Sequence, residues 1–389
     1  MRYADKIETI KPFQVMQALA RAQALESAGH HVVHLEVGEP DFDTAKPIVE
    51  AGQQALRDGR TKYTSAVGIT PLREAIAMHY EQLGVTVDPT RIVVTSGASA
   101  GLNLLAALLL NPAEEMLIAD PGYPCNEVFV RAVGAQPRPL SVTAAERFQP
   151  TAEQVRATWT DATRGVLFAS PANPTGTMLA ARRLQAIADA VAEHDGFFIL
   201  DEIYQGLVQQ AEYNTGLSIR DELFVLNSFS KYFGMTGWRL GWIVLPEEAV
   251  QPATSLAQNL FICPSAPAQY AALAGFSAAS LEIHEARREA FARRCRLLYD
   301  GLLALGFKIP VYPDGAFYLY VDVTHSGLSS GEFCNRLLEE YHVATTPGAD
   351  FGDFEADRYV RIAYTNSEAE LQAALERIAA ALQAWGVLP

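Results

Sequence analysis

The chain has 389 residues, of which 49% are hydrophobic and 19% charged, and its formal net charge is −15. This length exceeds what one hydrophobic core usually covers, so it predicts one large domain and a smaller one. The acidic balance and the lack of a long basic run argue against binding to nucleic acid or to acidic membrane surfaces.

The cysteines and the apolar stretches exclude further classes of protein. The four cysteines are widely spaced and form no CxxC, so we expect neither a disulfide framework nor a metal site. The first residues, "MRYADKIETI", contain no apolar core of a signal peptide. The longest apolar stretch, "LNLLAALLL" (102–110), is too short to span a bilayer. We therefore expect a cytoplasmic protein with no membrane partner.

The first elements in chain order are a helical piece at 12–28 and the segment "VVHLEVGEPDF". Short apolar runs without alternation come next, and such runs indicate strands that are buried on both faces. Helical patterns, such as 183–195, separate the runs and favour a mainly parallel sheet with helices on both sides. The runs are 91–95, 116–120, 165–170, 197–201 and 223–228, and 240–245 is predicted as one more strand.

The texture of the chain changes after about residue 280. A long helix is predicted at 282–305, and alternating strands at 315–323 and 358–364 indicate a smaller sheet with one covered face. The predicted fold is therefore α/β, with a large domain around a mainly parallel sheet and a smaller α+β domain. The predicted boundaries are 1–45 for an N-terminal segment packing with the small domain, 46–285 for the large domain and 286–389 for the small domain.

Polar residues, Gly or Pro follow each apolar run, and in an open α/β sheet such strand ends meet at one crevice. The turn "TSGAS" (95–99) precedes a helix whose free N–H groups would suit a phosphate. Gly97 would let the backbone approach it closely. Ser228, Ser230 and Arg239 could add hydroxyls and a guanidinium. The alternative is an ordinary helix cap by Ser96 or Ser99.

Other strand ends carry candidate side chains of different kinds. Asp201 ends a strand, where a buried carboxylate needs a cation, unless it caps the next turn or forms a salt bridge. Tyr204 follows one turn later. Asn173, in "NPTG", is first of all a turn residue. Tyr123 could stack on a flat ligand or pack in the core.

A lysine stands among aromatic residues in "NSFSKYFGMTGWRLGW" (227–242). Apolar neighbours and a nearby arginine would lower the pKa of Lys231 and make its amine nucleophilic, although a lysine of this kind can also be a surface residue. A phosphate site, a flat ring, a cation that needs a carboxylate and a nucleophilic lysine together describe pyridoxal 5′-phosphate.

With these motifs the chain resembles the class I/II aminotransferases of fold type I, the aspartate aminotransferase superfamily. The resemblance extends from "VGEPDF" near residue 40 to "VRIAY" near residue 362 and includes "YTSAVGITPLREAIA", "NPTG", "LDEIY" and "SFSKYFGMTGWRLG" in the expected order. It implies an enzyme that moves the amino group of an L-amino acid to a 2-oxo acid through a Schiff base of pyridoxal phosphate on Lys231.

The resemblance also implies a role for each matching position. Lys231, Asp201 and Tyr204 would be catalytic, with Asp201 at the pyridinium nitrogen and Tyr204 and Asn173 at the phenolic oxygen. Tyr123 would stack on the ring, and Gly97, Ala98, Ser228, Ser230 and Arg239 would form the phosphate cup. Tyr63 would reach the phosphate of a neighbouring subunit, which implies a homodimer with shared sites. Arg361, helped by Gly38 and Asn173, would bind the substrate carboxylate.

The strand pattern agrees for Arg361, because Val360 and Ile362 share one face and Arg361 lies on the other. A solvent-facing strand arginine is the alternative. The stretches 7–16 and 258–270 offer Lys11 as their one cation, whereas Ile10, Phe13, Phe261 and Ile262 could line a pocket. We therefore expect a preference for neutral amino donors.

Two other functions fit the same cofactor residues. The fold type also contains C–S lyases and cyclopropane-forming synthases, which cleave a different bond from the same carbanion. A non-catalytic pyridoxal-phosphate-binding regulatory domain is the third possibility. The acidic charge and the combination of Lys231, Tyr204 and Arg361 argue against it.

Overall fold

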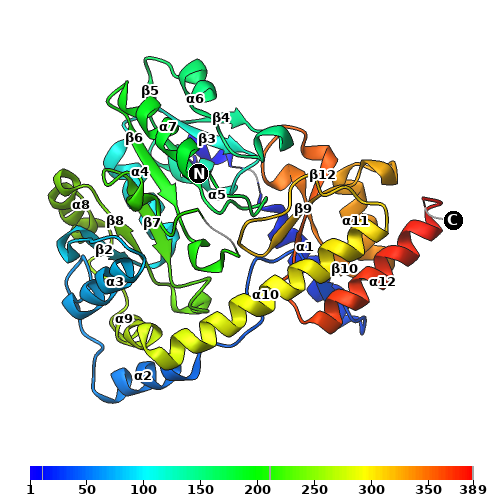
Figure 1. Cartoon of the computed structure of the whole chain (residues 1–389), viewed down its shortest axis with the longest axis horizontal. Coiled ribbons are helices and arrows are strands. Elements are labelled where there is room, and N and C mark those ends of the chain that lie inside the picture. The colour runs from blue at the N-terminus through cyan, green and yellow to red at the C-terminus, as the bar shows by residue number, and fades with distance from the viewer. Residues whose placement is uncertain (11, 210–211, 388–389) are drawn as a thin grey trace.

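The computed structural model describes residues 1–10, 12–209 and 212–387 of the chain. A large mixed sheet has the strand order β2-β8-β7-β6-β5-β3-β4 (Figure 1). All neighbouring pairs from β7 to β4 are parallel, and β8 is antiparallel to both β7 and β2. The predicted mainly parallel sheet is therefore confirmed. Its strands are β2 (Ile92–Thr95), β3 (Glu115–Asp120), β4 (Gln136–Ser141), β5 (Thr163–Ala169), β6 (Phe197–Asp201), β7 (Phe224–Ser228) and β8 (Gly241–Val244).

Helices cover both faces of this sheet, because alternate strand residues enter two separate cores. Val166 and Leu200 belong to one core, which also contains residues of α3 and α7. Leu167 and Ile199, their chain neighbours, belong to another core, with α4 and α8. The helices of this part are α2 (Lys46–Arg57), α3 (Thr70–Gln82), α4 (Gly97–Leu109), α5 (Cys125–Ala132), α6 (Ala152–Thr158), α7 (Ala181–Ala192), α8 (Glu247–Leu260) and α9 (Ala266–Leu273).

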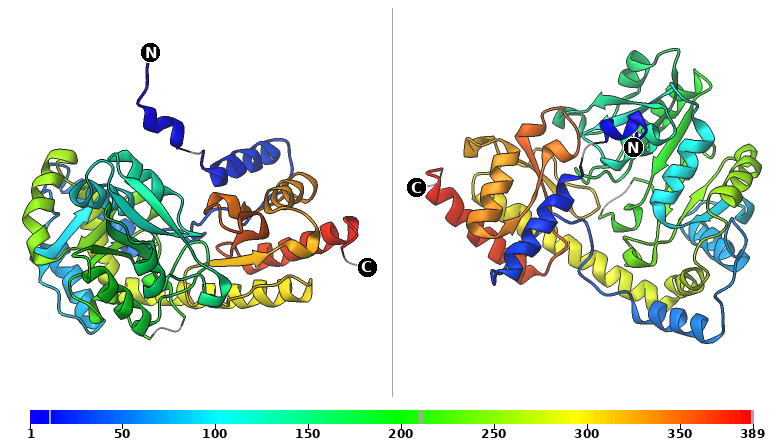
Figure 2. Two further views of the ribbon diagram at one scale, coloured as in Figure 1. Left: turned by 90° about the horizontal axis from the view of Figure 1, so that it is seen from above. Right: turned by 180° about the vertical axis from the view of Figure 1, so that it is seen from behind.

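A smaller antiparallel sheet has the order β11-β12-β9, and a short parallel pair joins β1 to β10. These strands are β1 (Val33–His34), β9 (Tyr318–Asp322), β10 (Val343–Ala344), β11 (Thr346–Pro347) and β12 (Tyr359–Ala363). The helices that accompany them are α1 (Gln14–Ser27), α10 (Ala278–Ala304), α11 (Ser330–Tyr341) and α12 (Glu368–Ala384). Figure 2 shows α1 beside this part of the molecule and the N-terminal residues projecting outside both sheets.

The expectation of one covered face for the small sheet is wrong. Every residue of β9 and β12 is buried. Val360 and its neighbours face the core of the small part. On the other face, Tyr320 and Tyr359 pack edge-on against Phe148 of the large part, with ring centroids 5.5 Å apart in each case. The second face is therefore covered by the large domain, which a pattern within one strand cannot reveal.

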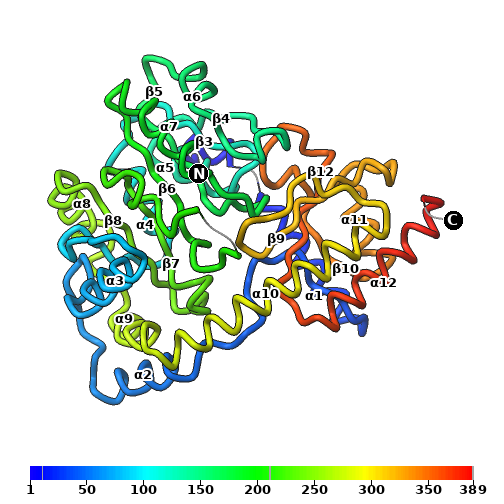
Figure 3. Tube along the Cα trace, viewed as in Figure 1, coloured from blue at the N-terminus to red at the C-terminus, as the bar shows by residue number. Residues whose placement is uncertain are grey.

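Helix α10 runs without interruption from the large sheet to the small one, as the tube in Figure 3 shows. Ser277 caps its first turn by accepting a hydrogen bond from the Ser280 N–H. The predicted boundary at residue 285 lies inside this helix, so the division into 1–45, 46–285 and 286–389 stays a prediction. Residue 11 and residues 388–389 of these ranges lie outside the described residues. Within the described ranges, no helix is long and apolar enough to cross a membrane.

Candidate active site

A cavity of about 300 Å³ lies where the strands of the large sheet end against the small sheet. Its lining comes from α1, the segment after β1, the start of α4, the ends of β5 and β6, and the loop after β7. The predicted site residues on its wall are Gly38, Ala98, Tyr123, Asn173, Asp201, Tyr204, Ser230, Lys231, Arg239 and Arg361. The fold thus brings together predicted site residues that are up to 323 positions apart in the sequence, from Gly38 to Arg361.

Lys231 faces this cavity while its aromatic neighbours pack in the core. Phe229 is fully buried and Phe233 is 2% exposed. The Lys231 ammonium donates a 2.6 Å hydrogen bond to the carbonyl of Gly38. Burial lowers the pKa of Lys231 to about 8, Glu39 opposes this shift, and Arg361 and Arg239 add to it. The lysine is therefore more readily neutral than an ordinary one, as its surroundings in the sequence predicted.

Asp201 ends β6 with 5% exposure, and its carboxylate accepts a 3.0 Å hydrogen bond from the Ile203 N–H. Within the described ranges it forms no ion pair, which excludes the salt-bridge alternative. Burial raises the pKa of Asp201 to about 6, against the effects of the Ile203 N–H and of Lys231. A cationic group in the cavity would restore the ionised form, because a buried carboxylate without a partner is costly.

Arg361 is 4% exposed, so the solvent-facing alternative is wrong. Its guanidinium donates a 2.9 Å hydrogen bond to Oδ1 of Asn173 and another to the carbonyl of Glu36. The ring centroids of Tyr318 and Phe351 lie 4.4 and 4.7 Å from the Cζ atom of Arg361. Its Nε is buried without a hydrogen-bond partner. Because these polar partners are neutral, the guanidinium can still bind a carboxylate through its planar fork.

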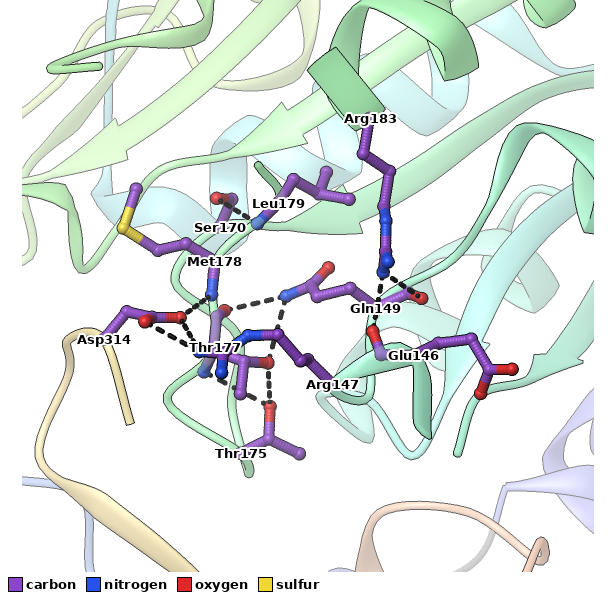
Figure 4. Close-up of polar contacts among 10 residues, drawn as sticks. All are labelled: Glu146, Arg147, Gln149, Ser170, Thr175, Thr177, Met178, Leu179, Arg183 and Asp314. Carbon is purple, nitrogen blue, oxygen red and sulfur yellow. Dashed lines mark hydrogen bonds and ion pairs between the residues drawn. The ribbon is translucent and has the colours of Figure 1, made fainter. Parts of the chain in front are cut away.

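The segment 175–179, which follows Asn173 in the chain, is held by the polar contacts shown in Figure 4. Asp314 accepts hydrogen bonds from the Met178 N–H at 2.8 Å and from Arg147 at 2.7 Å. Gln149 donates a 2.7 Å bond to the carbonyl of Thr177. Asp314 precedes β9, so these contacts attach the "NPTG" loop to the small sheet. The turn role predicted for this loop and a place for Asn173 on the cavity wall occur together.

The start of α4 is open to an anion. Ser96 precedes the helix, but its side chain makes no capping hydrogen bond, so this part of the cap alternative is wrong. Gly97 has φ +80°, and a Cβ at this position would lie 2.6 Å from Nη2 of Arg239. Only glycine therefore allows the guanidinium to approach the helix end. Ser228 is buried, and its Oγ accepts a 3.0 Å hydrogen bond from the Ser230 N–H.

Tyr63 is not brought to this cavity. It is 82% exposed and lies off the cavity wall of its own chain. Of the apolar residues predicted to line the pocket, Phe13 does so, whereas Ile10, Phe261 and Ile262 do not. The last two follow the end of α8, which packs in the same core as α4. This part of the prediction is wrong for the single chain, and Lys11 lies outside the described residues.

The sequence did not single out Tyr318 or Glu39. The hydroxyls of Tyr318 and Tyr204 are hydrogen-bonded at 2.9 Å, and both rings line the cavity. The side chain of Glu39 accepts a hydrogen bond from Thr236 at the cavity wall. A tyrosine that alternates with apolar residues in a strand is indistinguishable from a core residue, so only its register beside β12 reveals Tyr318.

The residues present fit pyridoxal phosphate. Three charged groups of the cavity wall, Asp201, Arg239 and Arg361, have no oppositely charged side chain as partner within the described residues. Asp201 would complement a pyridinium, and Arg239 with the end of α4 would complement a phosphate. Arg361 would complement a substrate carboxylate. The pKa of Lys231 suits attack on an aldehyde.

Comparison with known proteins gives matches over nearly the whole chain. The family model described as "Aminotransferase class I and II" matches residues 30–378. A valine–pyruvate aminotransferase of Mycobacterium tuberculosis is 36% identical over 372 residues, which are 95% of this chain and 96% of the relative. An aspartate/prephenate aminotransferase of Thermus thermophilus is 35% identical over 381 residues, 97% of this chain and 98% of the relative.

A solved structure agrees with these sequence matches. The crystal structure of an aminotransferase from Mycobacterium tuberculosis superposes with a TM-score of 0.95 at 34% identity. The superposition covers 99% of this chain and 100% of the other. The two-part architecture described above is therefore similar to that of a solved aminotransferase along its whole length.

Proposed function

We propose, since the chain belongs to the class I and II aminotransferases, that Lys231 is the residue through which it binds its cofactor and moves an amino group from an L-amino acid to a 2-oxo acid. The protein is a pyridoxal-phosphate-dependent transaminase. The observation that supports the assignment to Lys231 is a lysine of lowered pKa on the same cavity wall as three unpaired charged groups.

The residues around the cavity would hold the cofactor by its charged ends. The N–H groups of Gly97 and Ala98, the hydroxyls of Ser228 and Ser230, and Arg239 would bind its phosphate. Asp201 would hold the ring nitrogen protonated, and Tyr123 would stack on the ring. Tyr204 and Asn173 would donate hydrogen bonds to the phenolic oxygen. When bound, the cofactor supplies a carbonyl that condenses with amines and a ring that accepts electrons from Cα.

Lys231 would then act as the proton carrier. Its Nζ, once neutral, can take the proton from the substrate Cα and return it at the adjacent cofactor carbon. A pKa near 8 leaves about a tenth of the amine neutral at pH 7, far more than for a lysine at its ordinary pKa of 10.5. Arg361 and the backbone near Gly38 would fix the substrate carboxylate and so orient the Cα–H bond toward Lys231.

Neutral amino acids are the donors that the cavity favours. Phe13, Val15, Met16 and Val37 contribute an apolar part of the wall. Along the described chain, the cations of the cavity wall are those already assigned to the amine, the phosphate and the α-carboxylate. The relatives named above act on valine in one case and on aspartate in the other, and the apolar wall supports the first kind.

The homodimer with shared sites and the cytoplasmic location also belong to this proposal. The exposed Tyr63 supports the dimer, because a large polar aromatic side chain that does not reach its own cavity is free to reach another. Domains at 46–285 and 286–389, with the N-terminal segment on the small one, would place the cavity between them.

The assignment of Lys231 is tested with the Lys231→Ala variant. The purified variant should lack the visible absorbance of the cofactor–lysine linkage and nearly all turnover of L-alanine with 2-oxoglutarate or of L-leucine with pyruvate. Lys46→Ala serves as control, because the Lys46 side chain is 85% exposed and its ion pair among the described residues is with Glu50. A Lys231→Ala protein that keeps the linkage spectrum would show that another lysine binds the cofactor.

A further inference from the structure

The segment 37–43, here called the strap, forms one wall of the cavity and then runs along α10. Val37, Gly38 and Glu39 of the strap line the cavity. The carbonyl of Gly38 accepts the hydrogen bond from Lys231. The carbonyl of Glu36, just before the strap, accepts one from Arg361. The strap and the residue before it therefore contact both cationic side chains, and through the Glu36 carbonyl they bear on the proposed carboxylate-binding side chain Arg361.

Three side chains on one face of α10 contact the ring of Phe42 in the strap. Arg287, Phe291 and Arg294 are spaced four and three residues apart, which places them on the same side of a helix. The Phe42 ring lies edge-on to Phe291 with centroids 5.6 Å apart. The guanidinium carbons of Arg287 and Arg294 lie 5.2 and 4.7 Å from its centroid. Arg287 also donates a 2.7 Å hydrogen bond to the carbonyl of Asp43.

Arg294 makes the strongest of these contacts. Its Nη1 and Nη2 bind the two carboxylate oxygens of Asp41 at 2.7 and 2.9 Å, and its Nη1 also donates a 2.9 Å bond to the carbonyl of Thr365. The Arg294 side chain is 7% exposed and that of Asp41 is 28% exposed. Loss of Asp41 would leave the nearly buried Arg294 guanidinium without its carboxylate, and loss of Arg294 would release the strap from α10 at Asp41.

Thr365 connects this pair to the carboxylate end of the cavity. It follows β12, the strand that carries Arg361, and its hydroxyl donates a 3.4 Å hydrogen bond to the carbonyl of Val37. Arg294 thus holds two segments at once, the strap through Asp41 and the end of β12 through Thr365. These two segments carry the groups that meet at Arg361.

We propose that Arg294 is a positioning residue that sets the carboxylate-binding end of the cavity by fixing the strap against the end of β12. The proposal rests on the function proposed above, in which Arg361 binds the substrate carboxylate. Arg294 itself lies outside the cavity wall, so its effect should fall on substrate binding and leave the chemistry at Lys231 largely intact.

The test compares the holoenzyme variants Arg294→Ala and Asp41→Asn with Arg293→Ala. Arg293 is the matched control, because it lies next in the same helix but pairs with Glu368 at 3.6 Å with both side chains more than half exposed. Arg294→Ala and Asp41→Asn should raise KM for L-alanine about tenfold or more, with kcat within about threefold. KM of the double variant should not exceed the higher KM of the two single variants, since the two residues form one pair. Arg293→Ala should leave KM unchanged.

Melting temperature and cofactor absorbance identify variants that fail to fold. If Arg294→Ala does not fold, Arg294→Lys replaces it, because an ammonium cannot form the two-pronged contact and KM should still rise. Folded Arg294→Lys and Asp41→Asn enzymes with unchanged KM would overturn the proposal. A tenfold loss of kcat at constant KM would overturn it as well.

Arg361→Ala separates this inference from the proposed function. If Arg361→Ala leaves KM unchanged, Arg361 does not bind the carboxylate and the proposed function of that residue fails. If Arg361→Ala raises KM but the Arg294 and Asp41 variants do not, the carboxylate role of Arg361 stands and only the role of Arg294 is wrong.

Discussion

Burial acts in opposite directions on Lys231 and Asp201, because it disfavours the charged form of each. It lowers the pKa of the lysine to about 8 and raises that of the carboxyl group to about 6. Both side chains line the same cavity, although they are too far apart for a salt bridge. Each is therefore sensitive to a charge brought into the cavity. A cationic ring nitrogen would favour ionised Asp201, and an aldehyde would consume the neutral amine of Lys231.

Asp201→Ala separates binding of the cofactor from its use. The phosphate-binding groups are untouched, so the variant should still bind pyridoxal phosphate. Without the carboxylate the ring nitrogen loses the partner that keeps it protonated. Conversion of the enzyme by L-alanine in a single half-reaction should then slow by at least about a hundredfold. Stopped-flow absorbance measures this rate, with Asp201→Glu as the variant that keeps the charge. A wild-type rate in Asp201→Ala would contradict the role.

The sequence predicted single residues well where a charged side chain stands in or beside an apolar segment. Asp201 ends β6, Arg361 lies in the middle of β12 and Lys231 follows β7 among aromatic residues, and a charge in such a place needs a partner. Tyr318 lacks this signal, because a tyrosine in a buried strand usually packs in the core. Phe261 and Ile262 do not line the cavity of their own chain, because neighbourhood in the sequence does not show where the end of a helix lies relative to a cavity.

Among the elements, strands that form an uninterrupted apolar run were predictable, including the edge strand β2, and strands without such a run were not. Strand β6 is buried at nearly every position and appears in the sequence as an uninterrupted apolar run. Strand β4, "QPRPLS", contains two prolines and is mostly exposed, as an edge strand can be. The pair of β1 and β10 spans two residues on each side and depends on contacts between distant segments. Such pairs have no local signature.

The pair His34–Glu36 at β1 predicts a pH dependence of stability. The Nδ1 atom of His34 lies 2.8 Å from the fully buried carboxylate of Glu36, and this hydrogen bond is the main cause that raises the pKa of His34 to about 9. A folded-state pKa above the unfolded value of 6.5 means that the stabilisation is complete below pH 6.5 and is lost as pH rises through about 9.

The expected contribution is about 1–3 kcal/mol at pH 6. Melting temperatures of wild type and His34→Gln, measured from pH 6 to pH 9.5, isolate it, because other titrating groups are common to both proteins. The difference in melting temperature between the two proteins should be largest at pH 6 and should decrease toward pH 9.5. A constant difference would mean that the ionic contact of His34 with Glu36 does not contribute.

For the whole molecule, the proposed homodimer with shared sites makes a prediction that one chain cannot meet alone. Lys231→Ala and Tyr63→Ala homodimers should both be nearly inactive. A hybrid dimer of the two contains one site in which Lys231 and Arg361 come from one subunit and Tyr63 from the other. Hybrids purified with two different tags should recover about half of the wild-type activity per dimer. Verified hybrids as inactive as their parents would show that Tyr63 does not serve a neighbouring site.

The last prediction concerns the choice of amino donor, which depends on the charge balance of the whole cavity. A dicarboxylic donor brings a second carboxylate, and a carboxylate buried without a cation is costly. The cavity cations in the described residues already have a partner in the proposed complex, and Phe13, Val15 and Met16 add an apolar wall. Values of kcat/KM for L-alanine, L-leucine and L-phenylalanine should therefore exceed that for L-aspartate.

A designed cation checks the reason as well as the result. Met16→Arg places a guanidinium on the apolar wall at a side chain that is 53% exposed, where a charge is tolerated. It should raise kcat/KM for aspartate relative to alanine, whereas Met16→Leu should leave the ratio unchanged. If aspartate instead leads alanine by tenfold or more in the wild type, about 1.4 kcal/mol in the transition state, a cation from elsewhere in the chain or from a neighbouring subunit binds the distal carboxylate. The preference for neutral donors would then be wrong.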